Sequence, residues 1–198
     1  FFSYFSPDGT VEGGTNEAGL FFDFNAIPET EYKDYSKKKD YPGGHNALMQ
    51  YLLKNCKTVE EAFAMFRKYR DPDLRTSQMH LADKFGNLGI ILADSMWITK
   101  ADFQVSTNYN LCHEKTDSKA CWRFPIAERI LRTKEPSLDI FTMICDSTHQ
   151  RNAINTIYSN IHDLTTGDIW FYYGMDYKKA YKTNIHDLVA MGDTSILM

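Results

Sequence analysis

The order in which hydrophobic periodicity changes along this chain restricts the fold more than any single motif does. Alternation typical of strands occupies residues 1–5 and 20–25, and helical periodicity follows over residues 45–66. Alternation then returns, gives way to helical patterns that begin near residues 122 and 137, and returns once more toward the C-terminal end. Strands that come in hairpins, without strict strand–helix alternation, favour an α+β layered sandwich over a doubly wound parallel sheet.

The helical segments begin at recognisable start signals. Residues 45–56 have a helical pattern, and Thr58-Val59-Glu60-Glu61 forms a capping box that begins a second helix. The link between them is so short that we expect the two helices to pack as a hairpin. Residues 122–133 are again helical, and Ser137 is the expected N-cap of the next helix.

Turn residues divide the remaining apolar segments into strands. We expect Gly13-Gly14 to interrupt the chain, and the Asn16–Gly19 turn to pair the strand at residues 2–4 with the strand that starts at Leu20. A Lys84–Asn87 turn predicts a second hairpin. The remaining strands are expected at residues 78–82, 88–93, 103–107, 153–161 and 168–174.

Composition is that of one ordinary globular domain. With 198 residues, of which 43% are hydrophobic and 24% charged, the chain suits a single domain over residues 1–198. The net charge of -4 provides no basic field for nucleic acid, and Lys37-Lys38-Lys39 is either a solvated loop or a phosphate site. No apolar run has the length of a membrane span.

Metal and cofactor chemistry has little support in the residue pattern. The four cysteines show no CxxC spacing, and His80, His162 and His186 do not cluster at metal-ligand spacing. Gly13-Gly14 is not followed by the pattern of a phosphate-binding loop. We therefore expect no metal and no organic cofactor.

Local nucleophile candidates are weak. Cys112 and His113 are adjacent and would point apart on a strand. Cys145 and His149 are four residues apart near a helix end, and Ser147 has no GxSxG context. None of these pairs by itself indicates a catalytic site.

Asparagines at the ends of two apolar strands are stronger candidates. In "LFFDFN" the strand stops at Asn25, and in "VSTNYN" a second strand runs into Asn108. A carboxamide at the end of a rigid strand either turns the chain, here before Pro28, or offers a donor to an oxyanion. Arg123 lies among large apolar residues near a helix start, where it would form a surface ion pair or meet a carboxylate.

Four segments, in their order and separations, carry a resemblance to a known family. These segments are "GGTNEAGLFFDFNA", "VSTNYN", "WRFPIAERIL" and "NTIYSNIHDLTTGDIWFYYG". The chain resembles, over residues 1 to about 175, the choloylglycine hydrolase family of linear-amide C-N hydrolases, which includes bile salt hydrolases and penicillin V acylases and is related to penicillin-forming acyltransferases.

This resemblance implies an N-terminal-nucleophile hydrolase fold, a four-layer αββα sandwich of two antiparallel sheets between helices. In such enzymes a cysteine at the mature N-terminus attacks an amide carbonyl, and its own α-amino group acts as the base. By position, Asn25 resembles the asparagine that stabilises the oxyanion, Asn108 the one that orients the α-amino group, and Arg123 the arginine near the nucleophile.

The resemblance also sets the expected partners. A small N-acyl amide is the implied substrate, and homo-oligomers are usual in the family. Tyr32, Tyr35 and Tyr41 suggest an aromatic loop that either lines an acyl or steroid pocket or lies on the surface. The sequence does not indicate a cellular compartment, because any export signal would precede residue 1.

The first residue departs from the family pattern. Phe1 has no nucleophilic atom, and in the family the cysteine strand precedes the segment that resembles residues 1–5. We therefore expect an N-terminally truncated sandwich, with the front strands missing from these 198 residues. The alternative is a catalytically inactive binding or structural domain of the same fold.

Overall fold

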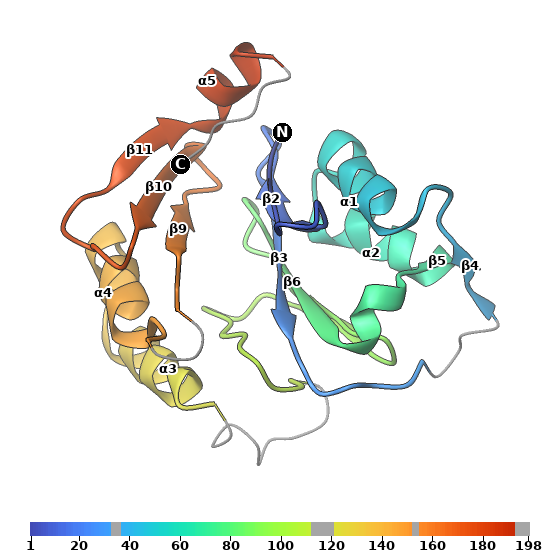
Figure 1. The fold of residues 1–198 in the computed structure, drawn as a ribbon, viewed down its shortest axis with the longest axis horizontal. Helices are drawn as coiled ribbons and strands as arrows, with labels where there is room; N and C mark the ends of the chain where they lie inside the picture. The colour runs from blue at the N-terminus through green and yellow to red at the C-terminus, as the bar shows by residue number, and fades with distance from the viewer. Residues whose placement is uncertain (33–36, 112–120, 152–154, 193–198) are drawn as a thin grey trace.

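Two antiparallel sheets form the middle layers of the fold, and helices cover their outer faces (Figure 1). The computed structural model describes residues 1–32, 37–111, 121–151 and 155–192. The larger sheet contains, in spatial order, β1 (Phe2–Phe5), β2 (Val11–Thr15), β3 (Leu20–Ala26), β6 (Ser77–Asp83), β7 (Leu88–Ile91) and β8 (Met96–Thr99). The smaller sheet contains β11 (Tyr181–Asn184), β10 (Asp168–Tyr173) and β9 (Tyr158–His162).

Helices pack on the outer side of each sheet. On the larger sheet lie α1 (Gly44–Asn55) and α2 (Val59–Lys68), and on the smaller sheet lie α3 (Arg123–Thr133) and α4 (Leu138–Thr148) (Figure 1). The short elements are β4 (Lys39–Asp40), β5 (Tyr69–Arg70), the 3-10 helix η2 (Pro72–Arg75) and α5 (Ile185–Ala190). This is the expected α+β four-layer αββα sandwich.

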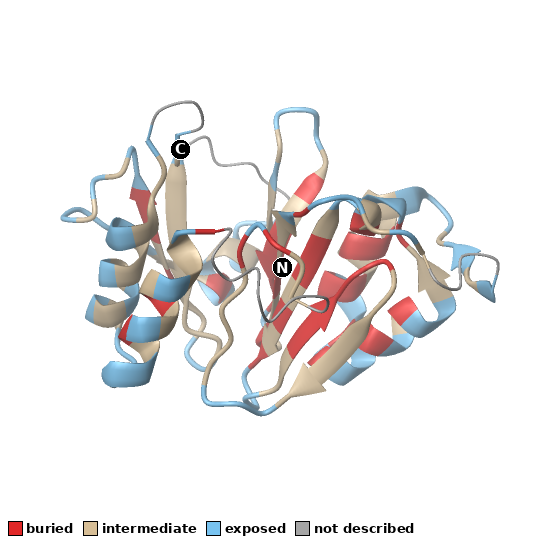
Figure 2. Ribbon diagram, turned by 90° about the horizontal axis from the view of Figure 1, so that it is seen from below, coloured by how far each residue is buried: buried red, intermediate tan, exposed pale blue. Residues whose placement is uncertain are grey.

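Strand β3 shows how alternation divides the two sides of the larger sheet. Leu20 and Phe22 are fully buried and belong to the main core with α1 and α2. Phe21 faces the smaller sheet, where its ring lies 4.9 Å from the ring of His162. Figure 2 shows buried residues concentrated where the larger sheet meets its helices.

The sequence signals for the helices are confirmed. Thr58 Oγ1 accepts a hydrogen bond from Glu61 N at 3.2 Å, so the N-cap of α2 is as expected. The Glu61 carboxylate, however, accepts from Lys57 N at 2.6 Å, one residue before the cap. Ser137 caps α4 by accepting from Ile140 N at 3.3 Å.

The expected break at Gly13-Gly14 is wrong, because both glycines lie inside β2. A Cβ atom on Gly13 would lie 2.2 Å from Tyr4 Oη, and one on Gly14 would lie 2.5 Å from the Phe2 carbonyl oxygen. These glycines therefore permit close packing of β2 on β1. The Asn16–Gly19 turn consequently joins β2 to β3, and β1 pairs with β2 instead.

The strand expected at residues 103–107 is also wrong. That segment is irregular, and the strand beside β7 is β8, which precedes it. Hydrogen bonds from side chains, and not a strand ladder, fix the position of this segment. Gln104 Nε2, for example, donates to the Gly89 carbonyl at 3.1 Å. Because this segment has no sheet pairing, its backbone polar groups need partners from side chains.

Candidate functional site

The C-terminal end of β3 brings Asn25 against the segment that follows β8. Asn25 is half-buried, and its Oδ1 accepts a hydrogen bond from Ser106 Oγ at 2.6 Å. Among the described residues, the structure gives Asn25 Nδ2 no hydrogen-bond partner. The carboxamide therefore has its acceptor occupied and its two donor hydrogens available.

Gln78 holds the same segment from β6. It lies directly opposite Asn25 in the β3–β6 ladder and is fully buried. Its Nε2 donates to the carbonyls of Thr107 at 2.7 Å and Tyr109 at 2.8 Å, and its Oε1 accepts from Leu111 N at 3.2 Å. One buried carboxamide thus substitutes for the missing sheet pairing.

Asn108 and Arg123 complete the cluster. Asn108 Nδ2 donates at 2.8 Å to the carbonyl of Ala26, the residue after Asn25. The guanidinium of Arg123, the first residue of α3, donates to Asn108 Oδ1. The three residues singled out from the sequence are therefore linked, through Ala26 and Ser106, around one end of β3.

Cys121 is a member of this neighbourhood that the sequence did not indicate. Burial by itself would raise the pKa of its thiol, but hydrogen bonds with Thr107 and Arg123 and the charge of Arg123 lower the pKa to about 7. No spacing motif contains Cys121, so the sequence offers no signal for it, although it lies two residues before Arg123. The thiols of Cys56 and Cys145 have pKa values raised by burial to about 11.

The other sequence candidates lie outside the described residues or are engaged in other contacts. Cys112 and His113 lie outside the described residues. His149 comes within 3.6 Å of Asp146, stacks on Tyr177 and accepts a hydrogen bond from Arg151 Nε at 2.8 Å. In the aromatic loop, Tyr35 is also outside the described residues, whereas Tyr32 and Tyr41 pack against the main core.

One cluster with metal-ligating atoms exists among the described residues. His45 Nδ1 lies 2.8 Å from Asp71 Oδ2 and 3.3 Å from Asp73 Oδ2, and its Nε2 lies 2.9 Å from the Val11 carbonyl oxygen. Burial would lower the pKa of His45, but the hydrogen bond and charge of Asp71 raise it to about 9. The imidazolium thus neutralises the fully buried Asp71 carboxylate, which is a structural role.

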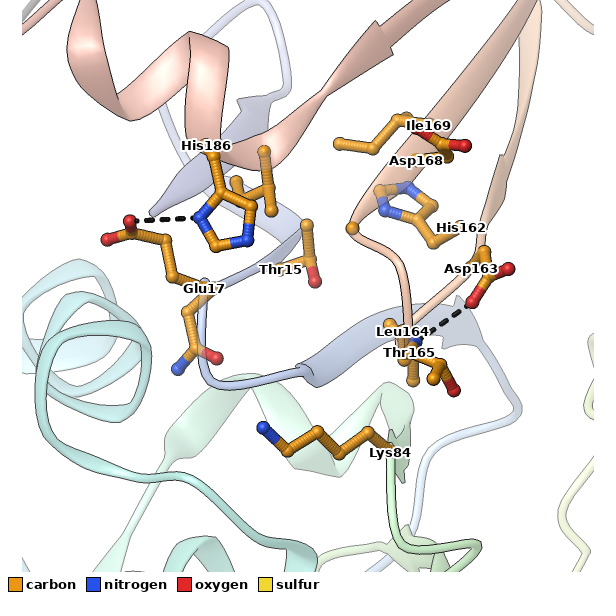
Figure 3. Close-up of a pocket in the computed structure, with 13 residues that line it drawn as sticks. Thr15, Glu17, Lys84, His162, Asp163, Leu164, Thr165, Asp168, Ile169 and His186 are labelled. Carbon is orange, nitrogen blue, oxygen red and sulfur yellow. Dashed lines mark hydrogen bonds and ion pairs between the residues drawn. The ribbon is translucent and has the colours of Figure 1, made fainter.

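Two cavities lie elsewhere between the sheets. A polar cavity of about 30 Å³, large enough for a water molecule, lies between the β2–β3 and β9–β10 turns (Figure 3). His186 reaches Glu17 at 3.4 Å beside it. An apolar cavity of about 430 Å³ lies between β9, α4 and Phe21. Neither is lined by Asn25, Asn108 or Arg123.

His162 and Asp23 are among the ionisable side chains that face the space between the sheets. His162 lines both cavities, and burial lowers its pKa to about 4, so the ring is neutral. Asp23, two residues before Asn25, has a pKa raised by burial to about 7. The structure places His162 at the end of β9, and neither of its ring nitrogens has a hydrogen-bond partner among the described residues.

Two solved structures with this arrangement of layers are named as an acylase and a hydrolase. Penicillin V acylase from Agrobacterium tumefaciens superimposes with a TM-score of 0.68 at 18% identity, covering 89% of this chain and 67% of that chain. A variant of conjugated bile acid hydrolase from Clostridium perfringens gives 0.71 at 11% identity, with 93% and 76% covered. The fold is therefore that of the N-terminal-nucleophile hydrolases.

Sequence comparison gives the family. The profile of acyl-coenzyme A:6-aminopenicillanic acid acyl-transferase matches residues 2–176, and this chain belongs to that family. No curated protein matches the sequence. No helix in the described ranges has the length and apolar character needed to cross a bilayer.

Proposed function

We propose that the protein hydrolyses the linear amide bond of an N-acyl small molecule, with a nucleophilic N-terminal cysteine supplied from outside residues 1–198. The observation that carries the proposal is the gathering of Asn25, Asn108 and Arg123 at one end of β3. Membership of the acyl-transferase family and the acylase and hydrolase names of the structural relatives support the same chemistry.

Asn25 is the proposed oxyanion donor. When a thiolate attacks an amide carbonyl, the carbonyl oxygen becomes an oxyanion that needs a fixed donor. Asn25 Nδ2 offers such a donor because Ser106 occupies the opposite end of the carboxamide. A preorganised donor of this kind contributes about 3 kcal/mol to transition-state stabilisation.

Arg123 and Asn108 are the proposed electrostatic partners of the nucleophile. Arg123 already lowers the pKa of the neighbouring Cys121, so its charge favours a thiolate at this position. Asn108 Oδ1 accepts from Arg123 and retains a second lone pair, which can accept from the α-amino group of the incoming residue.

The proposed reaction proceeds through a thioester. The cysteine thiol gives its proton to its own α-amino group while sulfur bonds to the carbonyl carbon. The C-N bond then breaks as that proton passes to the leaving amine. Water attacks the thioester, the carboxylic acid leaves and the thiol is regenerated.

Two features of the smaller sheet support an additional segment there. Among the described residues, strand β9 has a strand neighbour on one side only, and the apolar cavity of about 430 Å³ lies beside it. No residue of α4 is fully buried, and Phe141 is 39% exposed on that helix. A further strand along β9 would pair its free backbone groups and cover the apolar surface.

The test uses the protein with its complete chain. Intact mass and N-terminal sequencing determine whether the mature protein starts with cysteine. Release of free amine is then measured on penicillin V, a glycine-conjugated bile acid and an N-acyl homoserine lactone. We expect turnover of at least one substrate, and a loss of kcat of about 100-fold in Asn25→Ala.

Asn55→Ala is the matched control, since Asn55 is an exposed carboxamide at the end of α1. Equal activity in wild type and Asn25→Ala would remove Asn25 from the mechanism. A mature protein without an N-terminal cysteine and without turnover would favour the inactive binding domain instead.

A further inference from the structure

A hydroxyl group outside the three candidate catalytic residues determines which end of the Asn25 carboxamide is free. Ser106 Oγ and Asn25 Oδ1 are 2.6 Å apart, although the two residues are 81 positions apart in the chain. A hydroxyl that donates to Oδ1 turns the nitrogen of the same carboxamide away from itself. The orientation of Asn25 is therefore set by Ser106.

We infer that Ser106 is a positioning residue for the oxyanion donor, and that Gln78 holds the segment on which Ser106 lies. The inference rests on the proposed function, because positioning matters only if Asn25 Nδ2 meets a developing oxyanion. Ser106 does not touch the reacting atoms in this account. It acts through Asn25 alone.

The backbone around Ser106 has no ladder to fix it. The segment is irregular, so the three hydrogen bonds of Gln78 replace sheet pairing from Thr107 to Leu111. Asn108 ties the same segment to the Ala26 carbonyl at 2.8 Å. Contacts with β6, through Gln78, and with the end of β3, through the Ala26 carbonyl, thus hold Ser106 against Asn25. They give the donor a fixed geometry.

Removal of the hydroxyl would free the carboxamide to rotate by 180°. The flipped form presents Oδ1 to the oxyanion, where two acceptors repel each other. Loss of a whole oxyanion donor costs about 100-fold in kcat. Loss of its orientation should cost less, and we expect about a tenfold fall, because part of the population keeps the productive form.

The experiment compares Ser106→Ala with Ser106→Thr in the complete protein. The alanine variant should lose about tenfold in kcat while KM stays within about twofold, and threonine, which keeps a hydroxyl, should restore most of kcat. Ser77→Ala is the control, since Ser77 is a neighbouring hydroxyl that donates to the Asp73 carbonyl at 2.7 Å. Thermal unfolding of each variant excludes a folding defect.

A spectroscopic measurement separates this inference from the proposed function. In ¹⁵N-labelled protein, the side-chain amide resonances of Asn25, assigned with Asn25→Asp, should shift in Ser106→Ala and return in Ser106→Thr. This readout needs no turnover, so an inactive wild type would overturn only the proposed function. An unshifted Asn25 amide, or an unchanged kcat in an active Ser106→Ala protein, would overturn the positioning role.

Discussion

Arg123 donates a hydrogen bond to Asn108 Oδ1 and thereby joins the first turn of α3 to the irregular segment after β8. The Asn108 carboxamide is used at both ends, because its Nδ2 donates to the Ala26 carbonyl at 2.8 Å. The end of β3 is consequently connected to a helix of the opposite outer layer. A change in Arg123 should therefore alter the electrostatics of the whole cluster.

The reactivity of Cys121 tests that electrostatic role. Because the pKa of its thiol is about 7, alkylation of Cys121 by iodoacetamide should accelerate as pH rises through 7. Arg123→Gln removes the charge and a hydrogen bond, so the midpoint should move upward by about one pH unit. Mass spectrometry measures the rates, with Cys56 and Cys145 as slow internal controls. An unmoved midpoint would show that Arg123 does not stabilise the thiolate.

The His45–Asp71 pair should make stability depend on pH. The pKa of His45 is raised in the folded state from 6.5 to about 9, so its contribution is complete below about pH 6.5 and is lost as pH rises through 9. The loss amounts to about 3 kcal/mol. Urea unfolding between pH 6 and 9.5 measures it. His45→Gln should flatten the dependence, and an equally steep curve in that variant would refute the assignment.

Gly13→Ala should destabilise the β1–β2 pairing. Its Cβ would lie 2.2 Å from Tyr4 Oη and 2.4 Å from Cζ, so the half-buried ring must move. We expect a loss of about 2 kcal/mol in the free energy of unfolding. A double-mutant cycle with Tyr4→Leu tests the cause, because the clash should disappear with the ring. Simple additivity would contradict the steric explanation.

Gln78→Leu should strongly destabilise the fold, although the leucine and glutamine side chains have similar volumes. It leaves two carbonyls and one amide of the 107–111 segment without their partner, at an expected cost of about 3 kcal/mol. Gln50→Leu on the half-buried face of α1 is the control. Chemical denaturation measures both variants. If the two lose the same stability, the segment is held by other contacts.

Local patterns in the sequence were sufficient for most elements. Thr58 and Ser137 were identifiable as N-caps because the cap bonds a residue only three positions away. Strand β3 was identifiable because its alternation reflects two different faces. The pattern was insufficient at residues 103–107, where an extended apolar segment resembles a strand but has no neighbour to pair with.

The sequence by itself determined most of the helices and strands and the positions where two asparagines follow apolar segments. Only the tertiary structure decided that Ser106 meets Asn25, that Gln78 holds the segment from Thr107 to Leu111, and that Arg123 reaches Asn108. The physical reason is the sequence separation between the residues that interact. Periodicity and caps report interactions within a few residues, whereas these contacts depend on the order and register of strands that are distant in the chain.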